Sequence, residues 1–578
     1  MKRGGFMKYV AACLKPRIPF IVFGFIVKFA GTVMDLLLPM ILSYMIDNIV
    51  PQKSVGLIAV WGLVMIVCAL LAFGANVAAN RMASKTARDA ALKIRSDLFE
   101  KISYLSCAAL DRFTVPSLIS RVSADTYNIH NMIGMVQRLG VRTPILLMGG
   151  IAVAFTVEPV LTLVLMAVMP FIGAVVYFVA RRGIRLYDDM QKTIDTMVRC
   201  VRENIGGIRV IKALSKTEYE KKRFDGINRA VAESDKKAGL NMSVSGPSIN
   251  FLLNFGMIAV ILIGAYRVNE GICTPGKIIA FMLYFTIMLN AVMSINRIFT
   301  VLSKGSASAE RISRVIEEED DTEIIPYDKK EGWDYISFEN VSFSYDKTKP
   351  AVDNISFSIK KGEKLGIIGT TGSGKTTLIS LLLRFYDTDT GVIRIDGENI
   401  RSIPLQTLRR KFAAAFQNDF LMSDTIENNI DFGRGIRKEK IRESAGAAQA
   451  AEFITGMPEG FEYKVGIRGG KLSGGQKQRL FISRAFAGDP EILILDDSSS
   501  ALDYKTEGRL RKEISTRFAD TTVIIVAQRI SSVKDADKIL VTDNGAAVGF
   551  GDHEHLMKNC PQYAAMEHFQ RGGAENEA

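Results

Sequence analysis

The first 300 or so residues contain several long apolar stretches, and these constrain the fold more than any other feature. A helix needs about 20 mostly apolar residues to cross a bilayer. Six segments meet this requirement, at about residues 18–46, 54–80, 130–156, 158–180, 247–268 and 277–303. The first continues almost directly into the second, which favours a retained helix over a cleaved signal peptide. The sequence therefore predicts an all-α domain with six transmembrane helices.

Basic residues predict how these helices are oriented. Lysines and arginines are enriched in the cytoplasmic loops of membrane proteins. They precede the first span and begin the long helix-periodic connections after the second and fourth spans, at Lys2, Arg3, Lys8, Lys15, Arg17, Arg81, Lys85, Arg181 and Arg182. We therefore expect a multi-pass protein of the plasma (inner) membrane with a cytoplasmic N-terminus. The net charge of +12 then reflects this bias, and we expect a lipid bilayer and no nucleic acid as a partner.

The second half of the chain has a different pattern. Residues 317–335 are charged and interrupted by proline, which is typical of a linker. Beyond them, short apolar strands alternate with helical segments, as expected of an α/β domain. The predicted organisation is a membrane domain at 1–316, a linker at 317–335, an α/β domain at 336–570 and a polar tail at 571–578.

A glycine-rich segment between a predicted strand and an apolar helix predicts a phosphate site. Glycines allow successive backbone N–H groups to turn toward a phosphate, and the helix N-terminus adds positive potential. In such a P-loop the lysine meets the β- and γ-phosphates and the next hydroxyl binds Mg²⁺. The segment here is Gly369, Thr370, Thr371, Gly372, Ser373, Gly374, Lys375, Thr376 and Thr377. Asp496, at the end of a predicted buried strand, is the expected second carboxylate toward Mg²⁺.

A second motif makes the interpretation specific. It is the signature segment, Leu472, Ser473, Gly474, Gly475 and Gln476, which lies between the P-loop and Asp496. Together these motifs resemble the nucleotide-binding domain of ABC transporters. With six spans in front, the chain resembles an ABC exporter half-transporter over residues 10–570: a helical transmembrane domain with long cytoplasmic extensions, followed by an α/β P-loop ABC ATPase domain.

The resemblance implies further roles. ATP and Mg²⁺ are the expected ligands, with Tyr345 stacking on adenine and Gln417 touching Mg²⁺. Residues 500–503 resemble a loop that contacts the opposite subunit. Residues 111–113 with 118–121, and residues 203–212, resemble two coupling loops that dock on nucleotide-binding domains. The family fold also implies a swapped pair of helices that reaches the partner subunit.

Two residues depart from the family pattern in the same pocket. The family has glutamate after the magnesium aspartate, and this chain has Asp497. Aspartate is shorter by one C–C bond, about 1.5 Å, and a misplaced general base can forfeit a factor of about 10²–10⁴ in rate. The family has histidine where this chain has Gln528, which cannot become a cation. The signature segment is intact, and we expect the N–H groups of Ser473 and Gly475 to face a partner's γ-phosphate.

This combination resembles the degenerate-site subunit of heterodimeric bacterial multidrug exporters. It implies a non-identical partner with the intact Glu and His, and a small, hydrophobic or amphipathic substrate. Two alternatives stay open: an ATP-gated channel or regulatory subunit without transport, and a slow homodimeric lipid or drug exporter. Also open is whether Lys28 and Asp35, inside the first span, line a substrate cavity or pair with neighbouring helices.

Overall fold

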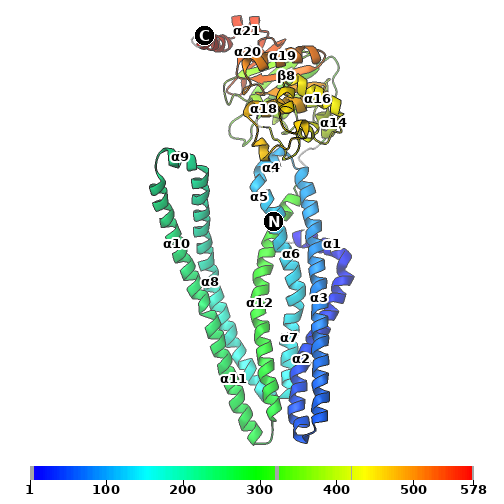
Figure 1. Cartoon of the computed structure of the whole chain (residues 1–578), viewed down its shortest axis with the longest axis vertical. Coiled ribbons are helices and arrows are strands. Elements are labelled where there is room, and N and C mark those ends of the chain that lie inside the picture. The colour runs from blue at the N-terminus through cyan, green and yellow to red at the C-terminus, as the bar shows by residue number, and fades with distance from the viewer. Residues whose placement is uncertain (1–4, 319–323, 418, 576–578) are drawn as a thin grey trace. The chain divides into compact units, whose positions relative to one another are not determined.

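The computed structural model describes residues 5–318, 324–417 and 419–575 and divides into two compact units (Figure 1). The first unit contains the chain up to Ser103 and Pro116–Glu317. The second contains Tyr104–Val115 and the chain from Glu318 onward. A short segment of the N-terminal half, Tyr104–Val115, thus belongs to the second unit.

The first unit is helical throughout its described residues. Six helical stretches are long and apolar enough to cross a membrane, namely Tyr9–Gln52, Val55–Ser103, Val115–Val157, Pro159–Gly206, Thr217–Asn269 and Pro275–Ile316. These confirm the predicted transmembrane class. The elements are α1 (Gly5–Leu14), η1 (Lys15–Arg17), α2 (Ile18–Tyr44), η2 (Met45–Ile49), η3 (Val50–Gln52), α3 (Val55–Ser103), α5 (Val115–Ser120), η4 (Arg121–Asp125), α6 (Thr126–Met135), η5 (Val136–Gly140), α7 (Val141–Val157), α8 (Pro159–Gly206), α9 (Ile208–Ala213), α10 (Thr217–Ser243), α11 (Ser245–Asn269) and α12 (Pro275–Ile316).

Several of these helices extend well beyond their apolar segments. At 1.5 Å per residue, the 49 residues of α3 extend for about 74 Å, more than twice a hydrocarbon core of about 30 Å. The α8 and α10 helices run side by side and diverge from the other helices toward α9, which joins their ends (Figure 1). The α9 end of this pair therefore stands apart from the rest of its unit.

The apolar core of the first unit centres on α12. Phe281, Tyr284 and Met288 are fully buried there. The Tyr284 hydroxyl donates a hydrogen bond of 2.7 Å to the Leu36 carbonyl oxygen, which connects α12 to α2.

Both charged residues of the first span contact neighbouring helices. The Lys28 ammonium donates to the Asn80 side-chain oxygen of α3 at 3.1 Å. The Asp35 carboxylate accepts from the Arg142 guanidinium of α7 at 3.0 Å and from the Asn76 amide of α3 at 3.3 Å. These contacts are of the kind expected if the two residues pair between helices.

The second unit contains two sheets. One is antiparallel in the order β2-β1-β4-β5; the other has the order β10-β9-β3-β8-β7-β6, with β3, β6, β7, β8 and β9 parallel. The strands are β1 (Ile336–Phe343), β2 (Val352–Ile359), β3 (Lys364–Gly369), β4 (Thr390–Ile395), β5 (Glu398–Asn399), β6 (Phe412–Ala415), β7 (Ile492–Asp496), β8 (Thr522–Ala527), β9 (Lys538–Asp543) and β10 (Ala546–Gly551).

The second unit also contains helices and helical turns. They are α4 (Cys107–Phe113), α13 (Lys375–Leu382), α14 (Leu405–Arg410), α15 (Ile426–Asp431), α16 (Lys438–Ala447), α17 (Ala451–Thr455), η6 (Gly460–Glu462), η7 (Ile467–Gly469), α18 (Gly474–Phe486), α19 (Tyr504–Arg517), α20 (Ile530–Val533), α21 (His553–Asn559) and α22 (Pro561–Glu575).

The candidate site lies at the carboxyl ends of the parallel strands. Each of the five residues of β7 is buried, as expected of a strand covered on both faces. The carboxyl ends of parallel strands meet at one sheet edge, where α/β folds bind ligands. The segments after β3, β6, β7 and β8 carry the P-loop, Gln417, Asp497 and Gln528.

The predicted linker and tail are more ordered than their composition suggests. Asp328, within the linker, accepts from the buried Arg394 guanidinium at 3.0 Å, and Lys329 forms a β-bridge with Glu398. The α22 helix continues to Glu575, so the segment assigned to the tail begins inside a helix; residues 576–578 lie outside the described chain.

Candidate nucleotide-binding site

The P-loop connects β3 to α13 with the backbone geometry that a phosphate cradle needs. Gly372 and Gly374 have φ angles of +83° and +92°, which favour glycine. A Cβ on Gly374 would lie 2.5 Å from the Ala351 carbonyl oxygen, so a side chain is also excluded by space. The Lys375 ammonium donates to the carbonyl oxygens of Gly369 and Thr370 at 2.9 and 2.7 Å. The lysine is thus held over the loop, and its burial lowers its pKa.

A cavity of about 330 Å³ lies in front of this loop. Its lining brings together the predicted nucleotide-binding residues Tyr345, Thr371, Gly372, Gly374, Lys375, Thr376, Thr377, Gln417, Asp496, Asp497 and Gln528. Of the remaining predicted residues, Gly369 ends β3, and the Ser373 hydroxyl is hydrogen-bonded to Thr542 at 2.9 Å and supports the loop from behind.

Tyr345 lies at one end of the cavity with about half of its surface exposed. Its hydroxyl lies 3.3 Å from the Thr377 hydroxyl. Its ring packs edge-on against Phe343 and Tyr386, with centroids 4.9 and 5.2 Å away. These edge contacts fix the orientation of the Tyr345 ring, a geometry suited to stacking on a planar base.

Asp496 fits a magnesium site. The residue is 1% exposed and its carboxylate accepts a hydrogen bond from Thr376, while burial raises its pKa. Its Oδ2 atom is buried and has no hydrogen-bond partner among the described residues. A buried carboxylate oxygen without a partner is costly unless a ligand satisfies it. Thr376, Asp496 and the amide oxygen of Gln417 would hold Mg²⁺, which when bound would offset the negative charge of the ATP phosphates.

Asp497 is bound by both glutamines of the pocket. The Gln417 amide donates to Asp497 Oδ2 at 2.8 Å, and the Gln528 amide donates to the same oxygen at 3.2 Å. The Asp497 backbone is left-handed, with φ of +48°, and its N–H donates to the Val526 carbonyl oxygen at 2.9 Å. Each carboxylate oxygen has about two acceptor positions, so the two amides fill those of Oδ2.

The electrostatics of Asp497 follow from this arrangement. Burial raises the pKa of its carboxyl, and the hydrogen bond from Gln417 and the charge of Lys375 oppose that rise. Both amide donors are neutral. Among the described residues, the carboxylate is thus held by neutral donors and forms no ion pair.

The signature segment begins α18. Ser473 caps this helix: its hydroxyl accepts from the Gln476 N–H at 3.3 Å and its own N–H donates to the Gln476 side chain at 2.9 Å. The capping box uses the Ser473 N–H within this chain, and the expected role of the Ser473 and Gly475 N–H groups toward a partner's phosphate stays a prediction. All five signature residues are described, and none lines the cavity at the P-loop.

The loop at Ser500, Ala501, Leu502 and Asp503 is connected to the signature helix. Gln478 of α18 donates to the Ser500 hydroxyl at 3.1 Å and accepts from the Ala501 N–H at 2.9 Å. Ser500 in turn donates to the Asp497 carbonyl oxygen at 3.0 Å. This chain of contacts joins α18 to the residue after the magnesium aspartate.

The part of the first predicted coupling segment that lies in α4 belongs to the second unit and contacts other residues of that unit. The Tyr386 hydroxyl donates to the Asp111 carboxylate at 2.6 Å, and Arg112 forms an ion pair with Glu318 at 2.5 Å. Tyr386 also packs against Tyr345, which lines the cavity, so the Tyr386 side chain connects α4 to a cavity residue. Sequence reasoning did not identify Tyr386, which has no motif and lies 275 residues from Asp111.

The second predicted coupling segment forms the exposed tip of the α8–α10 pair. Large apolar side chains there are exposed, including Ile205, Val210, Leu214 and Tyr219. Exposed apolar clusters of this kind are typical of interaction surfaces.

The fold and the cavity define a membrane protein with a P-loop nucleotide site. Comparison with known proteins agrees: the ABC transporter transmembrane region family matches residues 21–292, and the ABC transporter family matches residues 352–500. An uncharacterized ABC transporter ATP-binding protein of Bacillus subtilis, YfiB, is 33% identical over 94% of this chain and 95% of its own length. The ATP-dependent lipid A-core flippase of Vibrio vulnificus is 30% identical over 83% of each chain.

The fold also matches a solved structure. A bacterial Atm1-family ABC exporter with ATP bound superposes with a TM-score of 0.81, at 24% identity, over 97% of this chain and 99% of that one. The chain belongs to the ABC transporter family. It is a multi-pass membrane protein whose membrane domain is fused to an ATP-binding domain, with the Atm1-family exporter fold, and its ATPase domain couples ATP hydrolysis to transport.

Proposed function

We propose that this chain is one subunit of a heterodimeric ABC exporter, that its own site binds ATP and hydrolyses it slowly, and that its signature segment completes the catalytic site of a non-identical partner. The contact of Gln417 and Gln528 with one oxygen of Asp497 carries the proposal. A general base must accept a proton from the attacking water. Here two amides fill Oδ2 and fix the orientation of the carboxylate, so only Oδ1 is left to accept the proton, on a side chain one carbon shorter than glutamate.

The residues that would bind ATP show no departure from the family pattern comparable to those at Asp497 and Gln528. The P-loop, Lys375, Thr376 and the partnerless Asp496 Oδ2 are all oriented toward the cavity that Tyr345 borders. We infer that ATP stays bound at this site while the partner's site turns over. In this proposal Asp497, Gln528 and Gln417 have the catalytic positions, and hydrolysis at this chain's own site is weak.

The remaining features support a paired arrangement. None of the signature residues lines this chain's own cavity, and the exposed apolar tip at α9 suits a cleft on another nucleotide-binding domain. We place the N-terminus and the ATP-binding domain in the cytoplasm from the distribution of lysine and arginine. The proposed cargo is a small hydrophobic or amphipathic compound moved outward, a class consistent with the relative named as a lipid A-core flippase.

Copurification separates the heterodimer from the homodimer. A tagged chain is produced with an untagged copy of itself and with a candidate half-transporter that has the intact Glu and His. We expect the candidate to be retained in equal amount and the untagged copy to be lost. A stable dimer of identical chains that hydrolyses ATP at exporter-like rates would contradict the proposal.

Transport in inside-out vesicles separates the exporter from the channel alternative. The proposal predicts ATP-dependent accumulation of an amphipathic fluorescent compound by the heterodimer. Passive conductance on ATP addition, without accumulation, would favour a channel.

A further inference from the structure

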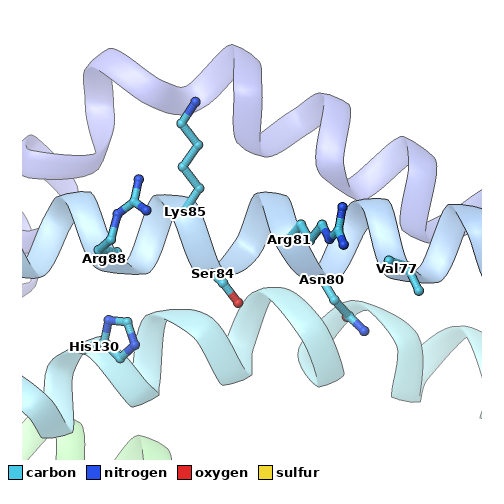
Figure 2. A pocket seen from close by; sticks show the side chains of 7 residues that line it. All are labelled: Val77, Asn80, Arg81, Ser84, Lys85, Arg88 and His130. Carbon is cyan, nitrogen blue, oxygen red and sulfur yellow. The ribbon is translucent and has the colours of Figure 1, made fainter.

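A basic groove lies on the first unit, where no motif predicted a site. Its volume is about 570 Å³, and residues of α3 and α6 line it: Val77, Asn80, Arg81, Ser84, Lys85, Arg88 and His130 (Figure 2). None of its lining side chains is acidic. The groove is separate from the nucleotide cavity, because every lining residue belongs to the first unit.

The groove lies at the end of the apolar part of α3. Residues 55–80 contain no charged side chain, and Arg81 is the first. At 1.5 Å per residue, Arg88 is about 10 Å further along the helix axis. The groove therefore begins where the hydrocarbon layer ends and continues into the head-group region.

An exposed apolar stripe leads into it along the same helix face. Leu63, Leu70 and Phe73 are exposed, with Phe73 at 69%. They precede Val77 and Arg81 at spacings of three, four and seven residues, which place side chains on one helical face. One face of α3 is thus apolar for several turns and then basic, which is the polarity of an amphiphile.

Two of the basic side chains are available to a ligand. Among the described residues, Arg81 has no hydrogen bond or ion pair, and Lys85 contacts only the Phe20 ring, 5.6 Å from its centroid. Figure 2 shows Lys85 extending toward α2, beside Arg88. Arg88 is less available, because it pairs with Asp89 at 3.1 Å.

A further positive charge lies behind the groove. Lys28 of α2 is 3% exposed and donates to the Asn80 side-chain oxygen at 3.1 Å. Because that oxygen is already used, Asn80 offers its N–H₂ group as a donor. The groove thus combines a guanidinium, an ammonium and an amide donor, the groups that bind phosphate oxygens.

We propose that this groove binds the phosphate head group of a lipid-like amphiphile whose acyl chains lie along the apolar stripe of α3. Arg81 and Lys85 contact the phosphate, and Leu70 and Phe73 contact the chains. Binding itself does not depend on the proposed function. Only the further step, that such amphiphiles are the exported substrates, rests on it.

The test compares two lipids that differ only in the phosphate, dioleoyl phosphatidic acid and dioleoylglycerol. The full chain in detergent micelles, without nucleotide, is titrated with each and the bound fraction is measured by native mass spectrometry. The variant is Arg81→Gln with Lys85→Gln. The matched control is Lys93→Gln with Arg95→Gln, which removes the same charge from exposed positions further along α3.

We expect wild type and control to bind phosphatidic acid more tightly than dioleoylglycerol. The groove variant is expected to lose about thirtyfold in phosphatidic acid affinity, equivalent to about 2 kcal/mol, with dioleoylglycerol unchanged. Equal affinity for both lipids, or an equal loss in the control, would overturn the proposal. Displacement by millimolar inorganic phosphate would also overturn it, since the ligand would then be a free anion.

Two further measurements keep the outcome interpretable. An unchanged thermal unfolding midpoint shows that the groove variant is folded. In proteoliposomes that contain the heterodimer, ATP-driven transfer of labelled phosphatidic acid that is lost in the groove variant supports the substrate assignment, and undiminished transfer overturns it. A failure of the heterodimer proposal would leave the nucleotide-free binding difference intact, so the two can be distinguished.

Discussion

Restoring the family's catalytic pair in this chain tests the role of Asp497. The perturbation is Asp497→Glu combined with Gln528→His. The added methylene moves the carboxylate by about 1.5 Å, away from the position where the amides of Gln417 and Gln528 hold it at 2.8 and 3.2 Å. The second change removes one of those two amides.

The expected magnitude follows from the geometry. A positioned general base contributes about 10²–10⁴-fold, and a misplacement of about 1 Å can cost about 10²-fold. We therefore expect the double variant to raise the chain's own ATP turnover by about 100-fold, with Asp497→Glu alone giving a smaller gain because Gln528 still contacts the carboxylate.

The assay is phosphate release by the purified heterodimer with saturating Mg²⁺ and ATP, in which the partner's own catalytic glutamate is replaced by glutamine so that turnover reports this chain's site. Lys375→Ala sets the background, and Asp497→Asn, which keeps the size and removes the charge, should show no gain. If wild type already turns over at about 1–10 s⁻¹, an ordinary enzyme rate, and the double variant changes this less than threefold, the reasoning about Asp497 is refuted.

Three further predictions concern coupling, pH and binding. Tyr386→Phe removes the hydrogen bond to Asp111 and keeps the ring against Tyr345. Substrate stimulation of ATPase activity should therefore fall about fivefold to tenfold, or about 1–1.4 kcal/mol, while ATP affinity stays unchanged. Equal stimulation in wild type and variant would contradict this prediction. Burial raises the pKa of Asp497, and only the ionised carboxylate is a base. As the pH is lowered, residual ATP hydrolysis should therefore decline at a higher pH than it would with an exposed aspartate. A pH profile identical to that of Asp497→Asn would exclude Asp497 as the general base. Lys375→Ala should weaken binding of a fluorescent ATP analogue by at least about tenfold, whereas Lys464→Ala, on a loop outside the cavity, should not.

Local sequence signals predicted the parts of the site that local backbone determines. The P-loop could be identified because its glycines, its preceding strand and its following helix are contiguous. Asp496 could be identified because it ends an apolar run. The six spans follow from hydrophobic length alone, a composition that only a bilayer makes favourable.

Contacts between distant segments could not be predicted in this way. Gln417, Asp497 and Gln528 follow three different strands, and the sharing of one carboxylate oxygen depends on how those strand ends meet. The Tyr386–Asp111 contact joins residues 275 positions apart. Arg81 and Lys85 indicated only membrane orientation, because a charge count does not show which charges lack a partner.

Vanadate trapping with photoactivatable azido-ATP distinguishes a chain that only holds ATP from a partner that hydrolyses it. Vanadate retains the nucleotide only at a site that has cleaved it, and irradiation attaches the label to the chain whose P-loop holds it. In the purified heterodimer, we expect vanadate-dependent label on the partner. On this chain we expect label that is present without vanadate and does not increase with it. Equal vanadate-dependent labelling of both chains would mean that both sites hydrolyse ATP and would refute the assignment of this chain as the ATP-holding subunit.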